Sequence, residues 1–251
     1  MNTDQQTVLD MLERLRPLLP AVATMDDATF DRFNRLWQAA GEAVKDAVFV
    51  AKNPDNPAAN RLRFELAAGA QALQNMIDIL PELHALMVAH YDRFEPLSLL
   101  DVGSGTGAGV NLLAQLHSET MIWSRLAITA IDVGPWRRRW IASQYPRIDY
   151  RVMQAADLPA RQWDFVVCSH VIEHVDDPGL LLEQVLRTCK GFALIYAPYN
   201  EIELSPGHLS TITEDVFAPH APVKLVIRES MAFYGEGRRC ILAVVDRRAG
   251  D

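Results

Sequence analysis

Apolar residues recur at spacings of three and four through residues 1 to about 95, which is the period of an amphipathic helix. These positions are Leu9, Leu12 and Leu15, followed by Phe30, Phe33, Trp37, Ala40, Val44 and Val48. Asp26 or Asp27 is suited to cap the second helix, and Pro81 to begin a helix that runs toward Tyr91. The pattern predicts four or five helices in this segment.

From about residue 97 the pattern changes to short apolar runs that alternate with helical stretches, which is typical of βαβ units and a parallel sheet. The predicted strands cover residues 98–102, 127–132, 149–153, 165–169, 192–197, 224–230 and 240–245. Gly235-Glu236-Gly237 is suited to a hairpin turn, so the last two strands are expected to be antiparallel.

The fold class predicted from this order is α/β, with a Rossmann-like, mostly parallel seven-stranded sheet that ends in a C-terminal antiparallel hairpin. An all-helical N-terminal segment precedes the sheet. We therefore divide the chain into a helical segment, residues 1–95, and a ligand-binding domain, residues 96–251. The helical segment is expected to cover an acceptor site or to form an oligomer surface.

The composition is that of a globular protein, since 49% of the 251 residues are hydrophobic. No run of about 18 apolar residues is present, and the N-terminus lacks the pattern of a secretory signal. Cys168, Cys189 and Cys240 show no CxxC spacing and suggest neither a disulfide framework nor a zinc site. We expect a cytoplasmic protein that does not enter a membrane.

The formal net charge of −8 argues against a dedicated DNA or RNA partner, because phosphate backbones are bound by clustered Lys and Arg. One local basic run, Arg137-Arg138-Arg139, lies between Trp136 and Trp140. Three adjacent arginines on a helix point in three directions, so we interpret the run as a solvated face. The alternative is a contact with an anionic group of a substrate.

A glycine-rich turn follows the first predicted strand, in the run Asp101-Val102-Gly103-Ser104-Gly105-Thr106-Gly107. Glycines permit positive φ and leave no Cβ in the way, so backbone N–H groups can approach a ligand at the start of a helix. Gly103, Gly105 and Ala108 satisfy the dinucleotide fingerprint, but S-adenosylmethionine suits the same turn. The turn alone leaves both ligands open.

Two further acidic positions lie at or after predicted strands. Asp132 ends the second strand, where a carboxylate can accept hydrogen bonds from the ribose hydroxyls of either ligand. Asp157 and Leu158 follow the third strand, where they can contact adenine, and this position favours S-adenosylmethionine. The chain then ends in a hairpin instead of a second mononucleotide-binding half, so a dehydrogenase is the less favoured interpretation.

Residues 97–247 resemble the class I S-adenosylmethionine-dependent methyltransferases, with motifs in that family's order. The most specific part is the segment from Trp163 to Pro178, which resembles the fourth strand and following loop of small-molecule methyltransferases. The resemblance implies the fold above, S-adenosylmethionine as cofactor and a set of cofactor-binding residues. These are Asp101, Gly103, Ser104 and Gly105 at the methionine end, Asp132 and Val133 at the ribose, Asp157 and Leu158 at the adenine, and Ser169 and His170 near the methyl group.

A hydroxyl acceptor would need a base within hydrogen-bond reach of its oxygen. His208, in a loop after the fifth strand, is the first candidate for this catalytic role, and His174 is the second, although His174 and Glu173 can instead shape their loop. Asp176 and Asp177 precede Pro178 and are interpreted as the start of a helix. No metal is predicted.

The function expected from these features is methyl transfer to a small-molecule acceptor, at oxygen more than at nitrogen, on a sugar or a secondary metabolite. A ribosomal RNA or protein methyltransferase is one alternative, and the acidic charge argues against the RNA version. A noncatalytic sensor of an adenosyl ligand is another. A homodimer is compatible with each of them.

Overall fold

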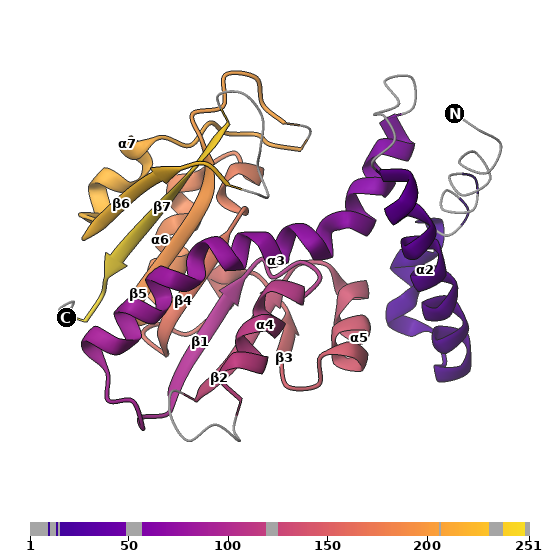
Figure 1. The fold of residues 1–251 in the computed structure, drawn as a ribbon, viewed down its shortest axis with the longest axis horizontal. Coiled ribbons are helices and arrows are strands. Elements are labelled where there is room, and N and C mark those ends of the chain that lie inside the picture. The colour runs from indigo at the N-terminus through magenta and orange to yellow at the C-terminus, as the bar shows by residue number, and fades with distance from the viewer. Residues whose placement is uncertain are drawn as a thin grey trace.

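A computed structural model describes residues 10, 14, 16–48, 57–118, 125–205, 207–230 and 238–248. It contains one seven-stranded sheet with the order β3-β2-β1-β4-β5-β7-β6 (Figure 1). The strands are β1 (Leu97–Val102), β2 (Leu126–Asp132), β3 (Asp149–Val152), β4 (Trp163–Ser169), β5 (Cys189–Tyr199), β6 (Lys224–Arg228) and β7 (Arg239–Asp246). All seven predicted strands are confirmed, and the predicted turn at Gly235–Gly237 lies outside the described residues.

The first five strands are parallel, and β7 pairs antiparallel with both β5 and β6. The predicted fold class is therefore confirmed. Parallel strands place their carboxyl ends at one edge of the sheet, where ligands bind in open α/β folds. Val102, Asp132, Ser169 and Tyr199 end their strands at this edge, which we call the carboxyl edge.

Helices cover both faces of the sheet, since apolar side chains occupy each face of its parallel strands. The longer helices are α2 (Asp27–Val48), α3 (Pro57–His90), α4 (Ala108–Leu116), α5 (Pro135–Gln144) and α6 (Pro178–Thr188). The shorter ones are η1 (Arg16–Thr24), η2 (Ala155–Asp157), η3 (Ile172–His174), α7 (Glu214–Phe217) and η4 (Ala218–His220). Side chains of α3, α4 and α5 pack on one face, and side chains of α6 and α7 pack on the other.

Helix α3 runs through Pro81 without a break, so the prediction that a helix begins at this proline is wrong. Ile79 and Leu83, on either side of it, are completely buried in the core on the α3 face of the sheet. Proline removes one hydrogen bond from a helix interior, and here the apolar packing of the surrounding turns offsets that loss. In Figure 1, α3 lies across the sheet as a single rod.

The elements η1 and α2 lie beside α5, away from the sheet (Figure 1). Asp26 caps α2, because its Oδ1 accepts a hydrogen bond of 2.9 Å from the backbone N–H of Thr29. Arg139 of α5 contacts the same turn, with Nη2 2.5 Å from Asp27 Oδ1 and its guanidinium over the ring of Phe30. None of the helices in the described ranges is long and apolar enough to cross a membrane.

The arginine run is only in part the solvated face that was predicted. Arg138 is exposed, but Arg139 docks the start of α2 and Arg137 forms an ion pair with Asp132, with Nη1 2.8 Å from Oδ2. Arg139 thus joins α5 to the start of α2, and Arg137 joins α5 to the end of β2. Helical periodicity cannot predict them, because it describes only neighbours on the same helix.

Candidate functional site

The glycine-rich turn lies between β1 and α4 at the carboxyl edge. Gly103 has a φ of 72°, and a Cβ there would lie 2.4 Å from Cγ2 of Val171 in the loop after β4. Gly105 has a φ of 56°, and a Cβ there would meet only Arg137 Nη1, 3.9 Å away. Gly103 is thus required by close packing as well as by φ, whereas Gly105 borders open space that a ligand can occupy.

Asp132 braces this turn. Its Oδ2 accepts hydrogen bonds from the backbone N–H of Gly105, at 2.9 Å, and from Arg137 Nη1, while its Oδ1 accepts one from the N–H of Gly134 at 2.9 Å. A carboxylate offers about four lone-pair sites, so one remains for a ribose hydroxyl. A second hydrogen bond from the ribose to Asp132 requires Arg137 or the glycine turn to move.

Asp101, the other acid near the turn, is buried at 5% exposure and lies close to Asp132 in β2. Burial, together with the smaller effect of the nearby negative charge of Asp132, raises the pKa of Asp101 to about 7. Asp101 therefore holds a proton in weakly acidic solution. Its contact with the methionine end of the cofactor stays a prediction.

Two buried hydroxyls lie at the same edge. Ser104 Oγ in the turn and Ser169 Oγ at the end of β4 each have no hydrogen-bond partner among the described residues. Buried polar atoms are normally hydrogen-bonded, and an orphan at a ligand edge indicates a partner supplied by the ligand or by water. Both residues belong to the predicted cofactor set.

The predicted adenine and ribose flank is more varied. Leu158 is 2% exposed and packs in the core cluster that includes α6, whereas Asp157 is exposed at the end of η2. Val133 is 68% exposed directly after Asp132. The structure thus brings Asp157 and Val133 to the surface near the carboxyl edge, and their contact with adenine or ribose remains a prediction.

A second group of side chains lies in the loops after β4 and β5. His170 has a φ of 54°, and its Nδ1 lies 3.3 Å from Oε1 of Glu173, which is completely buried. Burial lowers the pKa of His170, but hydrogen bonds to Cys240 and Glu173 outweigh it and raise that pKa to about 9. His170 thus faces the interior and the β4 loop more than the glycine turn.

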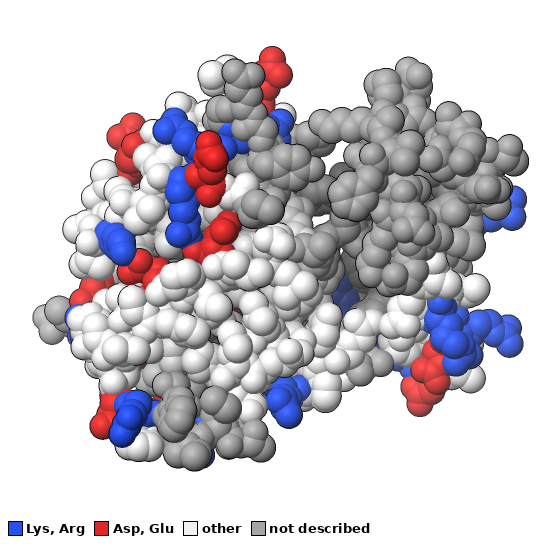
Figure 2. Space-filling view, in the orientation of Figure 1, with Lys and Arg blue, Asp and Glu red and all other residues white. Residues whose placement is uncertain are grey.

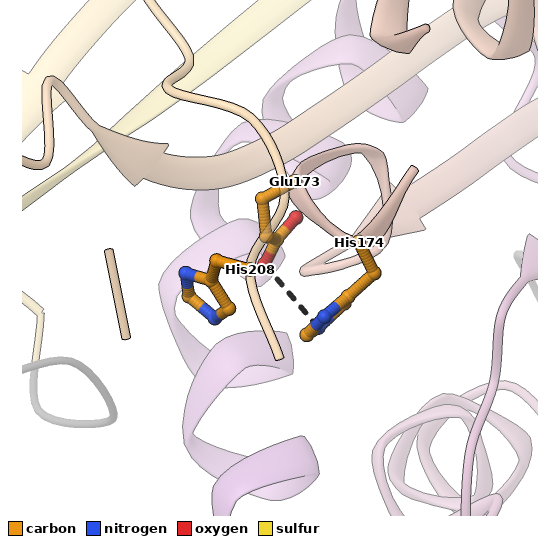
Figure 3. A group of neighbouring side chains, drawn as sticks. All are labelled: Glu173, His174 and His208. Carbon is orange, nitrogen blue, oxygen red and sulfur yellow. Dashed lines mark ion pairs between the residues drawn. The ribbon is translucent and has the colours of Figure 1, made fainter. Parts of the chain in front are cut away.

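His174 and His208, the predicted catalytic residues, lie close together in this second group, with ring centroids 4.8 Å apart (Figure 3). His174 Nδ1 is 2.8 Å from the carbonyl oxygen of Gly207, and His208 Nδ1 is 2.5 Å from Oε2 of Glu201. The backbone N–H groups of Leu209 and Ser210 donate to the carbonyl of Glu173 and hold the two loops together.

Glu201 lies in the loop after β5 and pairs with His208. Its seven-residue spacing from His208 in one loop gave no sign of an ion pair, because loop conformation decides that contact. Asp177 was placed correctly, since its Oδ1 caps α6 by accepting from the N–H of Leu180 at 2.9 Å. The ring of Tyr91, after α3, packs on Phe165 of β4 and Phe192 of β5, away from the carboxyl edge.

Residues 61–204 match a family described as Methyltransferase domain, which is more than half of the chain. The chain belongs to this methyltransferase family. The match spans α3, the glycine turn, Asp132 and the loop after β4, and it ends before His208. The resemblance to class I S-adenosylmethionine-dependent methyltransferases is thereby confirmed, as is S-adenosylmethionine as the cofactor of such a domain.

Curated relatives carry a common name. The chain is 34% identical over 120 residues to a ubiquinone biosynthesis O-methyltransferase of Xanthomonas axonopodis pv. citri, covering 43% of this chain and 45% of that protein. It is 36% identical over 116 residues to the protein of the same name from Caulobacter vibrioides, covering 41% of each. The chain thus spans less than half the length of the curated relatives it matches.

Solved structures share the fold at low sequence identity. The CMeT domain of the citrinin polyketide synthase superposes with a TM-score of 0.54 at 14% identity, covering 75% of this chain and 57% of that one. The [4+2]-cyclase SpnF superposes with a TM-score of 0.52 at 14% identity, covering 67% of this chain and 81% of that one. The second name shows that the fold alone does not define a reaction.

The residues at the carboxyl edge fit S-adenosylmethionine. The open space at Gly105 accommodates a ligand against the backbone of the turn, and Asp132 keeps one lone-pair site for a ribose hydroxyl. The orphaned hydroxyls of Ser104 and Ser169 supply further polar partners. Ser104 and Gly105 follow β1, and Ser169 ends β4. Because β1 and β4 are neighbours in the sheet, these groups lie at the same part of the carboxyl edge.

Proposed function

We propose that this chain transfers a methyl group from S-adenosylmethionine to an oxygen of a small-molecule acceptor, a hydroxyl of a sugar or secondary metabolite. The observation that carries the proposal is the juxtaposition, at one sheet edge, of a cofactor turn and a cluster of Glu173, His174 and His208. Gly103 packs directly under Val171, two residues before Glu173, so the two parts adjoin. Relatives named O-methyltransferase support oxygen as the atom that is methylated.

The chemistry requires little beyond positioning and control of one proton. Bound S-adenosylmethionine supplies an activated methyl group on a sulfonium, so the chain's main task is to align the acceptor and exclude water. A hydroxyl acceptor must also lose its proton. His174 and His208 are the side chains we propose to assist that loss, and Glu201 pairs with the ring of His208, which supports its orientation.

The charge of the chain supports a small acceptor over RNA. The formal net charge is −8, and Figure 2 shows Lys and Arg side chains interspersed with Asp and Glu on the face in view. A dedicated RNA surface would gather cations instead. A protein acceptor is the alternative to this proposal. A homodimer and cytoplasmic residence stay predictions, as does the division of the chain at residues 95 and 96.

The first experiment is a calorimetric titration of the full chain with S-adenosylmethionine, S-adenosylhomocysteine and NAD. We expect the two adenosyl ligands to bind and NAD not to bind. Asp132→Ala removes the brace of the glycine turn and the ribose acceptor, so it should weaken adenosyl binding by at least about tenfold. Asp149→Ala, which changes an exposed carboxylate on neighbouring β3, is the matched control and should bind as wild type does.

A transfer assay then separates an enzyme from a sensor. Labelled methyl groups from S-adenosylmethionine should appear in a hydroxylated acceptor from a panel of sugars and phenols. Adenosyl binding without transfer to any hydroxyl, amine or protein acceptor would favour the sensor. Binding of NAD alone would contradict the proposal at its first step.

A further inference from the structure

Glu173 is a buried carboxylate whose two oxygens are only partly compensated. Its side chain is 0% exposed, and neither Oε1 nor Oε2 accepts a hydrogen bond from the described residues. Its nearest charged neighbours are His170 Nδ1 at 3.3 Å and His174 Nε2 at 3.9 Å, both measured to Oε1. Burying an ionised carboxylate is costly unless a cation or several donors compensate for it. His170 faces Oε1 from one side, and Oε2 has no partner among the described residues.

His174 turns a nitrogen lone pair toward this carboxylate. Its Nδ1 lies 2.8 Å from the carbonyl oxygen of Gly207, and a carbonyl can only accept, so Nδ1 carries the proton. In the neutral ring Nε2 is then the unprotonated nitrogen, and it is the atom that faces Glu173. Two electron-rich atoms therefore face each other at 3.9 Å, which is favourable only when a proton or a metal ion lies between them.

His208 is held in the same tautomer by a carboxylate. Its Nδ1 is 2.5 Å from Glu201 Oε2, and Glu201 also accepts hydrogen bonds from the N–H and Oγ of Ser205 at 3.2 and 2.8 Å. Such a carboxylate draws the ring proton to Nδ1 and leaves the lone pair on Nε2. Histidines that bind metals are commonly oriented by a carboxylate or a backbone carbonyl on their other nitrogen, and both forms occur here.

We propose that Glu173, His174 and His208 bind a divalent transition-metal ion, with Zn²⁺ as the reference ion. One ligand atom from each residue lies within 4.8 Å of the other two (Figure 3). Zinc–nitrogen distances of about 2.0–2.1 Å place tetrahedral ligands roughly 3.4 Å apart, so the loops need to close by about an ångström. Two imidazoles and one carboxylate favour zinc or a neighbouring transition metal over magnesium or calcium.

Three protein ligands leave coordination positions for water or for the acceptor oxygen. In this role, which rests on the proposed methyl transfer, the acceptor hydroxyl bound at the metal releases its proton to water. The oxygen keeps the electron pair and forms the O–CH3 bond, while the S–CH3 bond breaks and S-adenosylhomocysteine leaves. His174 and His208 are then ligands instead of general bases, and this proposal departs from the sequence-based prediction of no metal.

The test measures metal binding directly on the full chain, free of any histidine tag and stripped with a chelator. Titration with Zn²⁺ should show one ion per chain, and Co²⁺ should give visible absorption bands of a site with nitrogen and oxygen ligands. His174→Ala, Glu173→Gln and His208→Ala should each weaken binding by at least about tenfold, and Glu201→Gln by about tenfold through the orientation of His208. His220→Ala, a histidine of η4 outside the cluster, is the matched control.

His174 is 42% exposed, so His174→Ala is the variant whose fold is least disturbed, and its thermal unfolding should match wild type. Failure to bind Zn²⁺ or Co²⁺, or equal binding by His174→Ala and wild type, would overturn the site and leave His170 as the counter-charge of Glu173. An unchanged methylation rate after metal removal would overturn the catalytic role. If wild type did not bind S-adenosylmethionine, the proposed function would be contradicted instead. The two failures can be told apart, because metal binding is measured without cofactor.

Discussion

Asp101 couples the stability of the cofactor turn to pH. Burial raises its pKa from 3.8 to about 7, so the folded state binds this proton more tightly than the unfolded chain does. Below about pH 4 the Asp101 carboxyl is protonated in both states and does not lower the free energy of unfolding. That free energy falls as the pH rises from about 4 to about 7. The penalty is full above that range, where the carboxylate is ionised in both states.

Asp101→Asn removes this ionisation and keeps the shape of the side chain. Its stability relative to wild type should therefore increase with pH, by up to ~4 kcal/mol at about pH 8. Denaturant unfolding of both proteins from about pH 4 to about pH 8 measures the difference. Asp149→Asn changes an exposed carboxylate, so its curve of stability against pH should run parallel to that of wild type. A curve for Asp101→Asn that also runs parallel to wild type would show that burial does not govern the pKa of Asp101.

At the scale of elements, one polar network fastens α3 to the sheet. Asp78 Oδ2 accepts hydrogen bonds from Tyr196 Oη of β5 at 2.7 Å and from Ser230 Oγ at 2.6 Å, and Arg228 of β6 donates to the Asp78 carbonyl. Tyr196 is completely buried. The network therefore joins the middle of α3 to the antiparallel end of the sheet.

Removing the acceptor from this network should cost more than removing the donor. Asp78→Ala leaves the buried Tyr196 hydroxyl without its carboxylate and should lower the free energy of unfolding by about 2 kcal/mol. Tyr196→Phe removes the hydroxyl together with its need for a partner and should cost about 1 kcal/mol. Chemical unfolding of both variants and of the exposed control Glu95→Ala provides the comparison. Equal values for Asp78→Ala and Glu95→Ala would mean that the network does not stabilise the fold.

The elements were predictable where local pattern decides them. Short apolar runs between helical stretches located every strand of the sheet. Strands that are covered by helices on both faces need apolar residues on both faces, which produces such runs. Pro81 misled the prediction, since a proline marks a helix start only when tertiary packing does not favour a longer helix. Arg139 and Asp27 were likewise missed as partners, because their contact depends on how α2 docks against α5.

At the scale of the whole molecule, the sequence predicted the cofactor edge better than the acceptor side. Gly103 and Asp132 lie at ends of regular strands, so the topology fixes their positions. Glu201 and His208 lie in a loop whose conformation depends on contacts with Glu173. Sequence spacing therefore identified His174 and His208. It did not show that both lie beside Glu173, or that Glu201 orients His208.

The core also determines which part of the helical segment the sheet requires. Met76, Ile79, Leu83, Leu86 and Met87 of α3 are buried against the same sheet face as α4. Burying an apolar side chain contributes about 1.5–3 kcal/mol, so these five together contribute roughly 8–15 kcal/mol, which is comparable to the entire stability of a typical domain. A chain of residues 96–251 should therefore fail to unfold cooperatively.

A chain of residues 57–251 keeps α3 and is the matched comparison. It loses η1 and α2, whose described contacts are with α5 and α3, so it should remain folded with a lower midpoint of thermal unfolding. Circular dichroism and calorimetry on both chains would measure this, with calorimetric binding of S-adenosylmethionine as a second readout. Cooperative unfolding of residues 96–251 at the midpoint of 57–251 would show that α3 is an appendage and would favour a division at residue 95. Cooperative unfolding of 57–251 alone would assign α3 to the methyltransferase domain and leave η1 and α2 as the appended part.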